Sequence, residues 1–432
     1  MPKIVFLGAG STIFAKSVLG DCLLTESLRD SELALFDIDP ERLKDSHLML
    51  ETINRHAGGY GKIVSYHDRR DALRGADYVI NAIQVGGYEP STVIDFEVPK
   101  KYGLRQTIAD TLGIGGIFRG LRTLPVMADF ARDVEELCPE AWFLNYTNPM
   151  SILTGYMLRY TGVKTVGLCH SVQVCAPHLL RGLGLPEDGV QYTIAGINHM
   201  AWLLSITRNG EDLYPQIKDL ARKRPEDHDD LVRYEIMKQF GYYVTESSEH
   251  NAEYLPYFIK NRNPELIDRF RIPLDEYPRR CLRQIAGWEQ MRQELVENKD
   301  LVHTMSHEYG ARIMDAMETN IPYKIGGNVL NTGLITNLPR EACVEVPCLV
   351  DSSGVQPCYV GDLPPQLAAL NRTNINVHLL TIEAFVARKK EHIYHAALLD
   401  PHTSAELTID EVVNLCDDLI LAHGDMLPEF NR

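Results

Sequence analysis

The sequence predicts an α/β protein, with an N-terminal Rossmann-like, doubly wound parallel sheet and a larger mixed α+β second lobe. Two observations predict this class. Over the first third of the chain, short apolar runs rich in β-branched residues alternate with helical stretches, which is typical of buried parallel strands. After about residue 190 the alternation stops, which predicts one domain over residues 1–190 and a second over residues 191–432.

Six strands are predicted in the first domain. They are Lys3–Leu7, Leu33–Phe36, Lys62–Tyr66, Tyr78–Ile83, Trp142–Asn145 and Lys164–Leu168. The second domain opens with a predicted hairpin of Tyr192–Ile197 and Trp202–Thr207. The polar run Arg222–Asp230 predicts a solvated loop, and the stretches Asn374–His395 and Ile409–His423 have helical periodicity.

Charge and cysteine content limit the class of protein. The 432 residues carry 59 acidic and 43 basic side chains, a formal net charge of −16, which argues against nucleic acid or an anionic membrane as the main partner. No apolar run reaches the length of about 18 residues that a membrane-spanning helix needs, and Met1–Gly8 lacks the apolar region of a secretory signal. The nine cysteines form no Cys-x-x-Cys pair, so we expect reduced thiols and a cytoplasmic protein.

A glycine turn near the N-terminus predicts a nucleotide site. Gly8-Ala9-Gly10-Ser11 follows the first predicted strand, so the first glycine allows a tight turn and the second lets the backbone approach a pyrophosphate. The third glycine of the dinucleotide fingerprint is replaced by Ile13. Asp37 ends the second strand, where a carboxylate can bind both ribose hydroxyls of NAD and repel the 2′-phosphate of NADP. The alternative is a tight turn with an acidic loop and no nucleotide.

Three further motifs follow predicted strands. They are Asn145-Tyr146-Thr147-Asn148-Pro149, Gly167-Leu168-Cys169-His170-Ser171 and Gly196-Ile197-Asn198-His199-Met200. Residues beyond the carboxyl ends of parallel strands line the crevice where ligands bind. Cys169 and His199 offer one thiolate and one imidazole, too few for a structural zinc site but suited to an open catalytic metal site. The alternatives are a small buried cysteine and a histidine that hydrogen-bonds the backbone.

Six motifs occur in a fixed order along the chain. They are Gly8-Ala9-Gly10-Ser11, Gln84-Val85-Gly86-Gly87, Asp110-Thr111-Leu112-Gly113-Ile114-Gly115-Gly116, Asn145-Tyr146-Thr147-Asn148-Pro149, Cys169-His170-Ser171-Val172 and Ile197-Asn198-His199-Met200. In this combination the chain resembles glycoside hydrolase family 4, from its N-terminus to near residue 425. The resemblance is greatest to the α-galactosidase, or melibiase, branch. The family is an exception to the rule that glycosidases use two carboxylates.

The resemblance implies an NAD- and Mn²⁺-dependent hydrolysis of unphosphorylated α-galactosides such as melibiose and raffinose. In the family, NAD⁺ oxidises the sugar at C3, which makes the C2 proton acidic, and the metal stabilises the enediolate. Loss of the C2 proton expels the C1 substituent, water adds, and NADH returns the hydride. The resemblance also implies a homodimer or homotetramer.

Site residues also follow from the resemblance. Cys169 and His199 match the metal ligands, and Asn148 matches a residue that holds substrate hydroxyls. Asp110 matches an acidic residue that raises the basicity of the catalytic base, with a helix cap or Asx turn as the rival interpretation. His170 is a proton donor to the leaving group, a partner of a sugar hydroxyl, or a group that orients Cys169. The base stays unassigned among Tyr242, Tyr243, Glu246, Glu249 and His250.

The substrate prediction depends on charge. In the phospho-specific branches of the family, an Arg after the Gly-Gly turn binds the 6-phosphate, whereas Gly86–Thr92 contains no cation. An α-galacturonidase is the alternative, and its substrate carboxylate would need a basic residue such as Arg279, Arg280 or Arg283. Two alternatives come from other classes: an NAD-dependent dehydrogenase, which would accumulate NADH with product, and a non-catalytic NAD sensor that ignores Mn²⁺.

Overall fold

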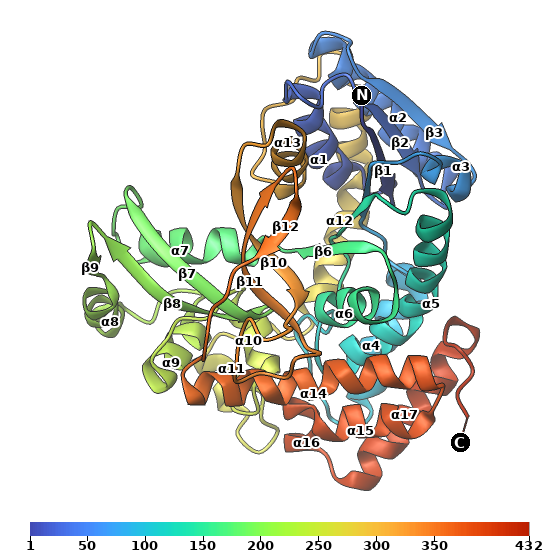
Figure 1. The fold of residues 1–432 in the computed structure, drawn as a ribbon. Helices are drawn as coiled ribbons and strands as arrows, with labels where there is room; N and C mark the ends of the chain where they lie inside the picture. The colour runs from blue at the N-terminus through green and yellow to red at the C-terminus, as the bar shows by residue number, and fades with distance from the viewer. Residues whose placement is uncertain (432) are drawn as a thin grey trace.

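The structure, a computed structural model, describes residues 1–431 and is built around one mixed sheet (Figure 1). The parallel part of the sheet has the order β3 (Lys62–Tyr66), β2 (Glu32–Phe36), β1 (Lys3–Leu7), β4 (Tyr78–Asn81), β5 (Trp142–Asn145) and β6 (Lys164–Leu168). This is the strand order of a Rossmann fold, so the predicted fold class is confirmed.

Alternate residues of β1 face two separate cores. Ile4 and Phe6 belong to the core that includes residues of α1 and α2, whereas Val5 and Leu7 belong to the core that includes residues of α5 and α6. The helices that follow these strands are α1 (Thr12–Leu24), α2 (Pro40–His56), α3 (Arg69–Leu73), α4 (Val93–Lys100), α5 (Gly113–Leu137), α6 (Met150–Tyr160) and α7 (Ser171–Gly182), with the short helical turn η1 (Gly87–Thr92) before α4.

The six predicted strands are all present, with small differences at their ends. β4 ends before the predicted Ile83, because the Ile83 N–H donates to Thr147 Oγ1 at 2.9 Å instead of to a neighbouring strand. That side chain comes from the loop after β5, so the early end of β4 brings two strand-end loops together at the carboxyl edge of the sheet.

The sheet continues beyond β6 with antiparallel strands. These are β10 (Tyr323–Leu330), β11 (Cys343–Asp351), β7 (Val190–Ile197), β8 (Met200–Arg208) and β9 (Glu211–Asp212), with β12 (Gly354–Pro357) paired to β11. β10 joins β6 through the pairs Gly327–Leu168 and Asn328–Gly167. β7 and β8 form the predicted hairpin. One sheet therefore runs through both parts of the chain, and the domain boundary at residue 190 remains a prediction.

The helices of the second half are α8 (Tyr214–Lys223), α9 (Leu231–Phe240), α10 (Ser248–Tyr254), α11 (Glu265–Arg269), α12 (Glu276–Arg292), α13 (Tyr309–Thr319), α14 (Pro365–Ala387), α15 (Lys390–Leu399), α16 (Pro401–Glu406) and α17 (Ile409–His423), with the turns η2 (Gln293–Glu297) and η3 (Gly424–Met426). Among them, α14 to α17 lie along the bottom of the molecule, whereas α13 lies at the top beside α1 (Figure 1). α14 and α15 pack against α5, which returns the C-terminal part of the chain to the Rossmann half.

The two predicted C-terminal helical stretches differ in outcome. Ile409–His423 is one helix, α17, whose N-terminus is closed by a capping box between Thr408 and Glu411. The stretch Asn374–His395 is divided between α14 and α15, because the chain turns at Arg388, where φ is 55°.

The prediction of a solvated loop at Arg222–Asp230 is wrong at both ends. Arg222 and Lys223 are the last two residues of α8. Asp230 is buried, and its carboxylate accepts hydrogen bonds from Arg233, Ser248 and Tyr243. A carboxylate in this position is stable because a guanidinium and two hydroxyl groups replace its water. The charged run did not indicate these hydrogen-bond partners, because Ser248 and Tyr243 lie outside residues 222–230.

Two further expectations concern membrane-spanning helices and the state of the cysteines. Within residues 1–431, no helix is both long and apolar enough to cross a membrane. The nine cysteines are free, and Cys169 is among the few that are not fully buried.

Candidate active site

The predicted metal pair is brought together at the carboxyl edge of the sheet. Cys169 follows β6, and His199 lies in the turn between β7 and β8. The Sγ atom of Cys169 is 3.2 Å from Nε2 of His199. His199 is 3% exposed, whereas Cys169 is partly exposed, so the pair has one side toward solvent.

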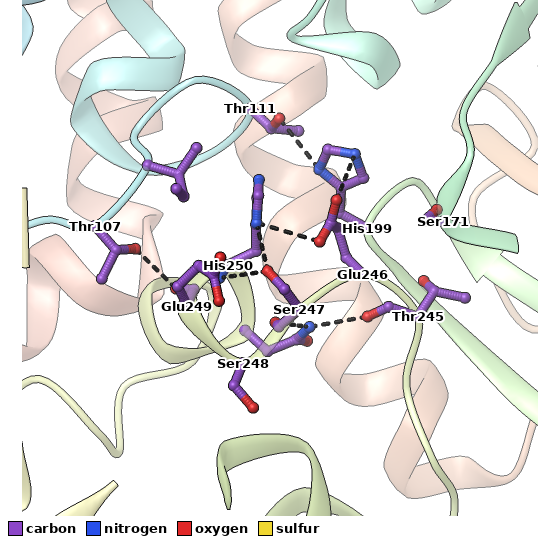
Figure 2. A network of polar contacts seen from close by, with 12 residues as sticks. Thr107, Thr111, Ser171, His199, Thr245, Glu246, Ser247, Ser248, Glu249 and His250 are labelled. Atoms are coloured by element: carbon purple, nitrogen blue, oxygen red, sulfur yellow. Dashed lines mark hydrogen bonds and ion pairs between the residues drawn. The ribbon is translucent and has the colours of Figure 1, made fainter. Parts of the chain in front are cut away.

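The second ring nitrogen of His199 is held by a separate set of residues. Nδ1 lies 3.0 Å from the hydroxyl of Tyr254 on α10. It also lies 3.3 Å from Thr111 Oγ1 (Figure 2). A proton on Nδ1 therefore has two acceptors, and Nε2 is the ring nitrogen that faces Cys169. Burial alone would lower the pKa of His199, but the adjacent Cys169 sulfur and Glu246 carboxylate raise it to about 10.

Glu246 and His250 extend this cluster (Figure 2). Glu246 Oε1 lies 4.0 Å from His199 Nε2, and Glu246 Oε2 lies 3.3 Å from His250 Nδ1. Burial raises the pKa of Glu246, but the charges of His250 and His199 outweigh it and lower the pKa to about 2. Ligand atoms of His199, Glu246 and His250 all lie within 4.8 Å of one another, which makes them a possible metal-binding group.

Asp110 lies against the same cluster. Its Oδ1 atom is 3.7 Å from His250 Nε2. Burial favours the neutral acid, but the nearby His250 imidazole and the charge of Arg119 hold the pKa of Asp110 well below its usual range. The N-cap of α5 is Leu112, so Asp110 does not cap that helix.

The loop that carries Asp110 is held by a buried carboxylate that the sequence analysis missed. Glu253 on α10 accepts the backbone N–H groups of Thr107 and Ala109 at 2.7 Å each, and that of Ile108 at 3.2 Å. The signal was present in the sequence: His250, Glu253 and Tyr254 are spaced i, i+3 and i+4, which predicts one face of a helix. α10 therefore positions Asp110 and His199 together.

His170 has its own partner, which the sequence analysis also missed. Its Nε2 atom lies 2.6 Å from the carboxylate of Glu308, just before α13. This hydrogen bond raises the pKa of His170 above its ordinary value. The His170 side chain is 46% exposed, so it can reach a ligand in the crevice. No local pattern indicated Glu308, because it is 138 residues away in the chain.

Asn148 lies in the loop after β5. Its Oδ1 atom accepts the Met150 N–H at 3.2 Å, and its backbone carbonyl accepts a hydrogen bond from Arg119 Nε at 3.3 Å. Arg119 also donates to the hydroxyl of Tyr277 at 3.1 Å. The amide nitrogen of Asn148 remains available to a substrate oxygen, since its recorded side-chain contact uses the amide oxygen alone.

The glycine turn has the shape predicted for a nucleotide cradle. A Cβ atom at Gly8 would lie 2.5 Å from the Ala82 carbonyl oxygen, and one at Gly10 would lie 2.8 Å from Asp37 Oδ2. Ser11 leaves the first turn of α1 without a side-chain cap, so its N–H groups can face a pyrophosphate. Asp37 Oδ2 accepts the Gly10 N–H at 2.7 Å, which ties the end of β2 to this turn.

The five candidates for the base separate into two groups. Tyr243 is fully buried and donates to Asp230, and Glu249 forms an ion pair with Arg280 at 2.5 Å. Tyr242 packs in the satellite core between α7, α8 and β8. The remaining two, Glu246 and His250, lie beside the metal pair.

The fold and the site define a Rossmann-type protein in which a thiol and an imidazole lie together at the carboxyl edge of the parallel sheet, a pair suited to a divalent cation. Residues 3–185 match the family 4 glycosyl hydrolases, and residues 194–403 match the C-terminal domain of that family. An α-galactosidase of Bacillus subtilis (strain 168) is 65% identical over 431 residues, which cover 100% of both chains. The chain belongs to glycosyl hydrolase family 4 and is a glycosidase.

Solved structures agree with this assignment. A putative glucosidase from Bacillus subtilis is 26% identical with a TM-score of 0.87, covering 97% of this chain and 99% of that chain. A 6-phospho-α-glucosidase from gut microorganisms, solved in complex with NAD and Mn²⁺, is 20% identical with a TM-score of 0.83, covering 99% of each chain. The predicted family and enzyme class are confirmed, and the predicted cofactors are those bound to this solved relative.

Proposed function

We propose that the protein is an NAD- and Mn²⁺-dependent α-galactosidase that hydrolyses unphosphorylated α-galactosides of the melibiose and raffinose type. The observation that carries the proposal is the 3.2 Å approach of Cys169 and His199 at the carboxyl edge of a Rossmann sheet. The 65% identity to an α-galactosidase over the full chain supports the choice of sugar.

The residues present fit both cofactors. A soft thiolate, an imidazole and nearby carboxylates are suitable ligands for a divalent transition metal. The turn at Gly8 and Gly10 lies so close to Ala82 and Asp37 that only glycine fits, which is the tight strand-to-helix turn that a pyrophosphate site needs. When bound, NAD⁺ would supply reversible hydride transfer and a divalent cation held by Cys169 and His199 would supply Lewis acidity beside the sugar.

The chain's own residues then have defined tasks. Asn148 would hold sugar hydroxyls through its free amide nitrogen. Asp110, 3.7 Å from His250, would strengthen a base on that side of the cluster. His170, hydrogen-bonded to Glu308, would donate a proton to the departing C1 oxygen.

Charge supports a neutral sugar. Arg279, Arg280 and Arg283 all form ion pairs with Glu276, so these candidates for a substrate carboxylate already have a carboxylate partner. Arg119 binds the Asn148 carbonyl and lies close enough to Asp110 to affect its pKa. A galacturonide would have to displace one of these contacts.

The test is a panel of nitrophenyl α-galactoside, α-glucoside and α-galacturonide, each with and without NAD⁺ and Mn²⁺. We expect rapid release of nitrophenol from the α-galactoside only, dependent on both cofactors and abolished by chelation. NADH absorbance should not rise with product. A preference for the galacturonide would favour the α-galacturonidase alternative, and NADH formed in step with product would favour a dehydrogenase.

A further inference from the structure

We propose that Glu246 is a third protein ligand of the cation held by Cys169 and His199. This inference rests on the proposed function, since that function supplies the cation. The observation behind it is that the Glu246 carboxylate approaches the same nitrogen, His199 Nε2, that the Cys169 sulfur approaches.

The distances suit one shared ion. Cys169 Sγ lies 3.2 Å and Glu246 Oε1 lies 4.0 Å from His199 Nε2. Donor atoms bound at about 2.0–2.3 Å from one cation lie about 3–4 Å from each other when the bonds are near-perpendicular or tetrahedral. The other nitrogen, Nδ1, is engaged by Tyr254 at 3.0 Å, so Nε2 is the ligand atom and Glu246 is on the correct side of the ring.

The only cationic partners of Glu246 among residues 1–431 are two imidazoles, whose charge depends on protonation. Its side chain is 24% exposed, and its recorded ion pairs are with His199 and His250 only; no Lys or Arg within residues 1–431 pairs with it. His250 in turn faces Asp110 at 3.7 Å. Two carboxylates and a sulfur thus surround two imidazoles, and a half-buried carboxylate without a permanent cationic partner is costly unless a metal compensates it.

The backbone gives an independent observation. His199 has φ of 62° and Glu246 has φ of 68°, the left-handed region that residues other than glycine rarely adopt. Such strained conformations are kept only where contacts with the surrounding structure hold them, and they are common at binding sites. Both residues that approach the same point are held this way, whereas Glu249, three positions further on, has ordinary backbone and pairs with Arg280.

With the Glu246 oxygen included, the set of donor atoms also suits Mn²⁺. A thiolate and an imidazole alone favour zinc or copper, whereas carboxylate oxygen is a preferred donor for Mn²⁺. Glu246 supplies that oxygen from the chain. The assignment removes Glu246 from the candidates for the C2 base and leaves His250, which is the candidate that faces Asp110.

The experiment is a Mn²⁺ titration of NAD-loaded protein, with free Mn²⁺ measured by its EPR signal. We compare wild type with Glu246→Gln, Cys169→Ser and the control Glu249→Gln. We expect Glu246→Gln to weaken Mn²⁺ binding at least tenfold while NAD binding, measured by protein fluorescence, is unchanged. Glu249→Gln should keep the wild-type Kd, because its partner is Arg280.

The outcomes separate the two proposals. If Cys169→Ser weakens Mn²⁺ binding and Glu246→Gln does not, the metal site stands and this inference is overturned. If neither variant changes the Kd, the metal assignment of the proposed function fails as well. A catalytic base at position 246 would give a wild-type Mn²⁺ Kd with activity lost, which also overturns the inference. Should Glu246→Gln not fold, Glu246→Asp provides the test, because its shortened carboxylate should bind Mn²⁺ more weakly than wild type.

Discussion

At the residue scale, the site depends on which nitrogen of His199 faces which partner. Tyr254 and Thr111 approach Nδ1, while Cys169 and Glu246 approach Nε2. When a histidine binds a metal through one ring nitrogen, the hydrogen bond on its second nitrogen fixes the orientation of the ring. In the proposed metal site, the hydroxyl of Tyr254 would orient His199 without touching the cation.

This role makes Tyr254→Phe informative. The substitution removes one acceptor of the Nδ1 proton and keeps the ring, so we expect Mn²⁺ affinity to fall about 10–100-fold with little change in NAD binding. EPR titration measures the Mn²⁺ Kd. Tyr102→Phe is the control, because its hydroxyl bonds Asp418 at the surface; equal Mn²⁺ Kd values for the two variants would contradict the role of Tyr254.

The hydrogen bond between His170 and Glu308 predicts a dependence on the leaving group. If His170 protonates the C1 oxygen, His170→Gln should lower kcat/KM for melibiose-type disaccharides by about 10²–10⁴-fold. The loss should be much smaller for nitrophenyl galactosides, because their leaving group departs without a proton. Glu308→Gln, which loses the charged partner at 2.6 Å, should give a smaller loss with the same ratio between substrates. Equal losses on both substrate types would indicate a binding role instead.

At the element scale, a buried carboxylate on α1 anchors the segment that carries Glu308. Asp21 Oδ1 accepts the Ser306 N–H at 2.7 Å and lies 2.7 Å from His303 Nε2, and Ser306 Oγ accepts the Glu308 N–H at 3.1 Å. The first helix after the glycine turn therefore supports the residue that hydrogen-bonds His170. Burial favours the neutral acid, but the hydrogen bonds with His303 and Ser306 outweigh it and lower the pKa of Asp21.

This shift predicts how Asp21→Asn depends on pH. A lowered pKa in the folded state means that the ionised carboxylate stabilises the protein above the unfolded pKa of about 3.9, and that this stability is lost as pH falls through the lower folded value. We expect Asp21→Asn to cost about 1–3 kcal/mol at neutral pH and progressively less in acid. Urea unfolding across this pH range measures the difference. The exposed Asp30→Asn is the control, and a cost for Asp21→Asn that is constant with pH would contradict the prediction.

At the scale of the whole molecule, the C-terminal helices are part of the Rossmann core. Leu415 on α17 is fully buried in the same cluster as Leu121 on α5 and Val79 on β4. His423, at the end of α17, lies 3.0 Å from the buried carboxylate of Asp95 on α4. The two ends of the chain therefore stabilise one another, and we expect them to unfold together.

Leu415→Ala tests this coupling. The cavity should cost about 2–5 kcal/mol, and the far-ultraviolet circular dichroism and tryptophan fluorescence transitions should stay coincident at a lower denaturant midpoint. Leu421→Ala on the same helix is the control; its side chain is 82% exposed, so its effect should be within about 0.5 kcal/mol. Separate transitions for the two probes would show that the C-terminal helices unfold independently of the Rossmann half.

Much of the fold was predictable because its signals are local. The parallel strands, the hairpin and α17 follow from apolar periodicity, and the glycine turn follows from a backbone that leaves no room for a Cβ at Gly8 or Gly10. The strand-end motifs could be assigned to one edge of the sheet because parallel strands end on the same side. The buried Asp230 could not be predicted, since a charged run is usually solvated and its partners lie elsewhere in the chain.

The sequence by itself determined the six strands of the first half, the doubly wound fold class, the family, and the identity of Cys169 and His199 as a candidate pair. Only the tertiary structure decided what surrounds them: Tyr254 is 55 residues from His199, and Glu308 is 138 residues from His170. Contacts of that separation depend on how helices and loops pack after the strands have formed. The periodicity of a sequence shows which residues share one face of a helix or strand. A buried polar group must be hydrogen-bonded, and its partners can come from any segment that the fold brings beside it.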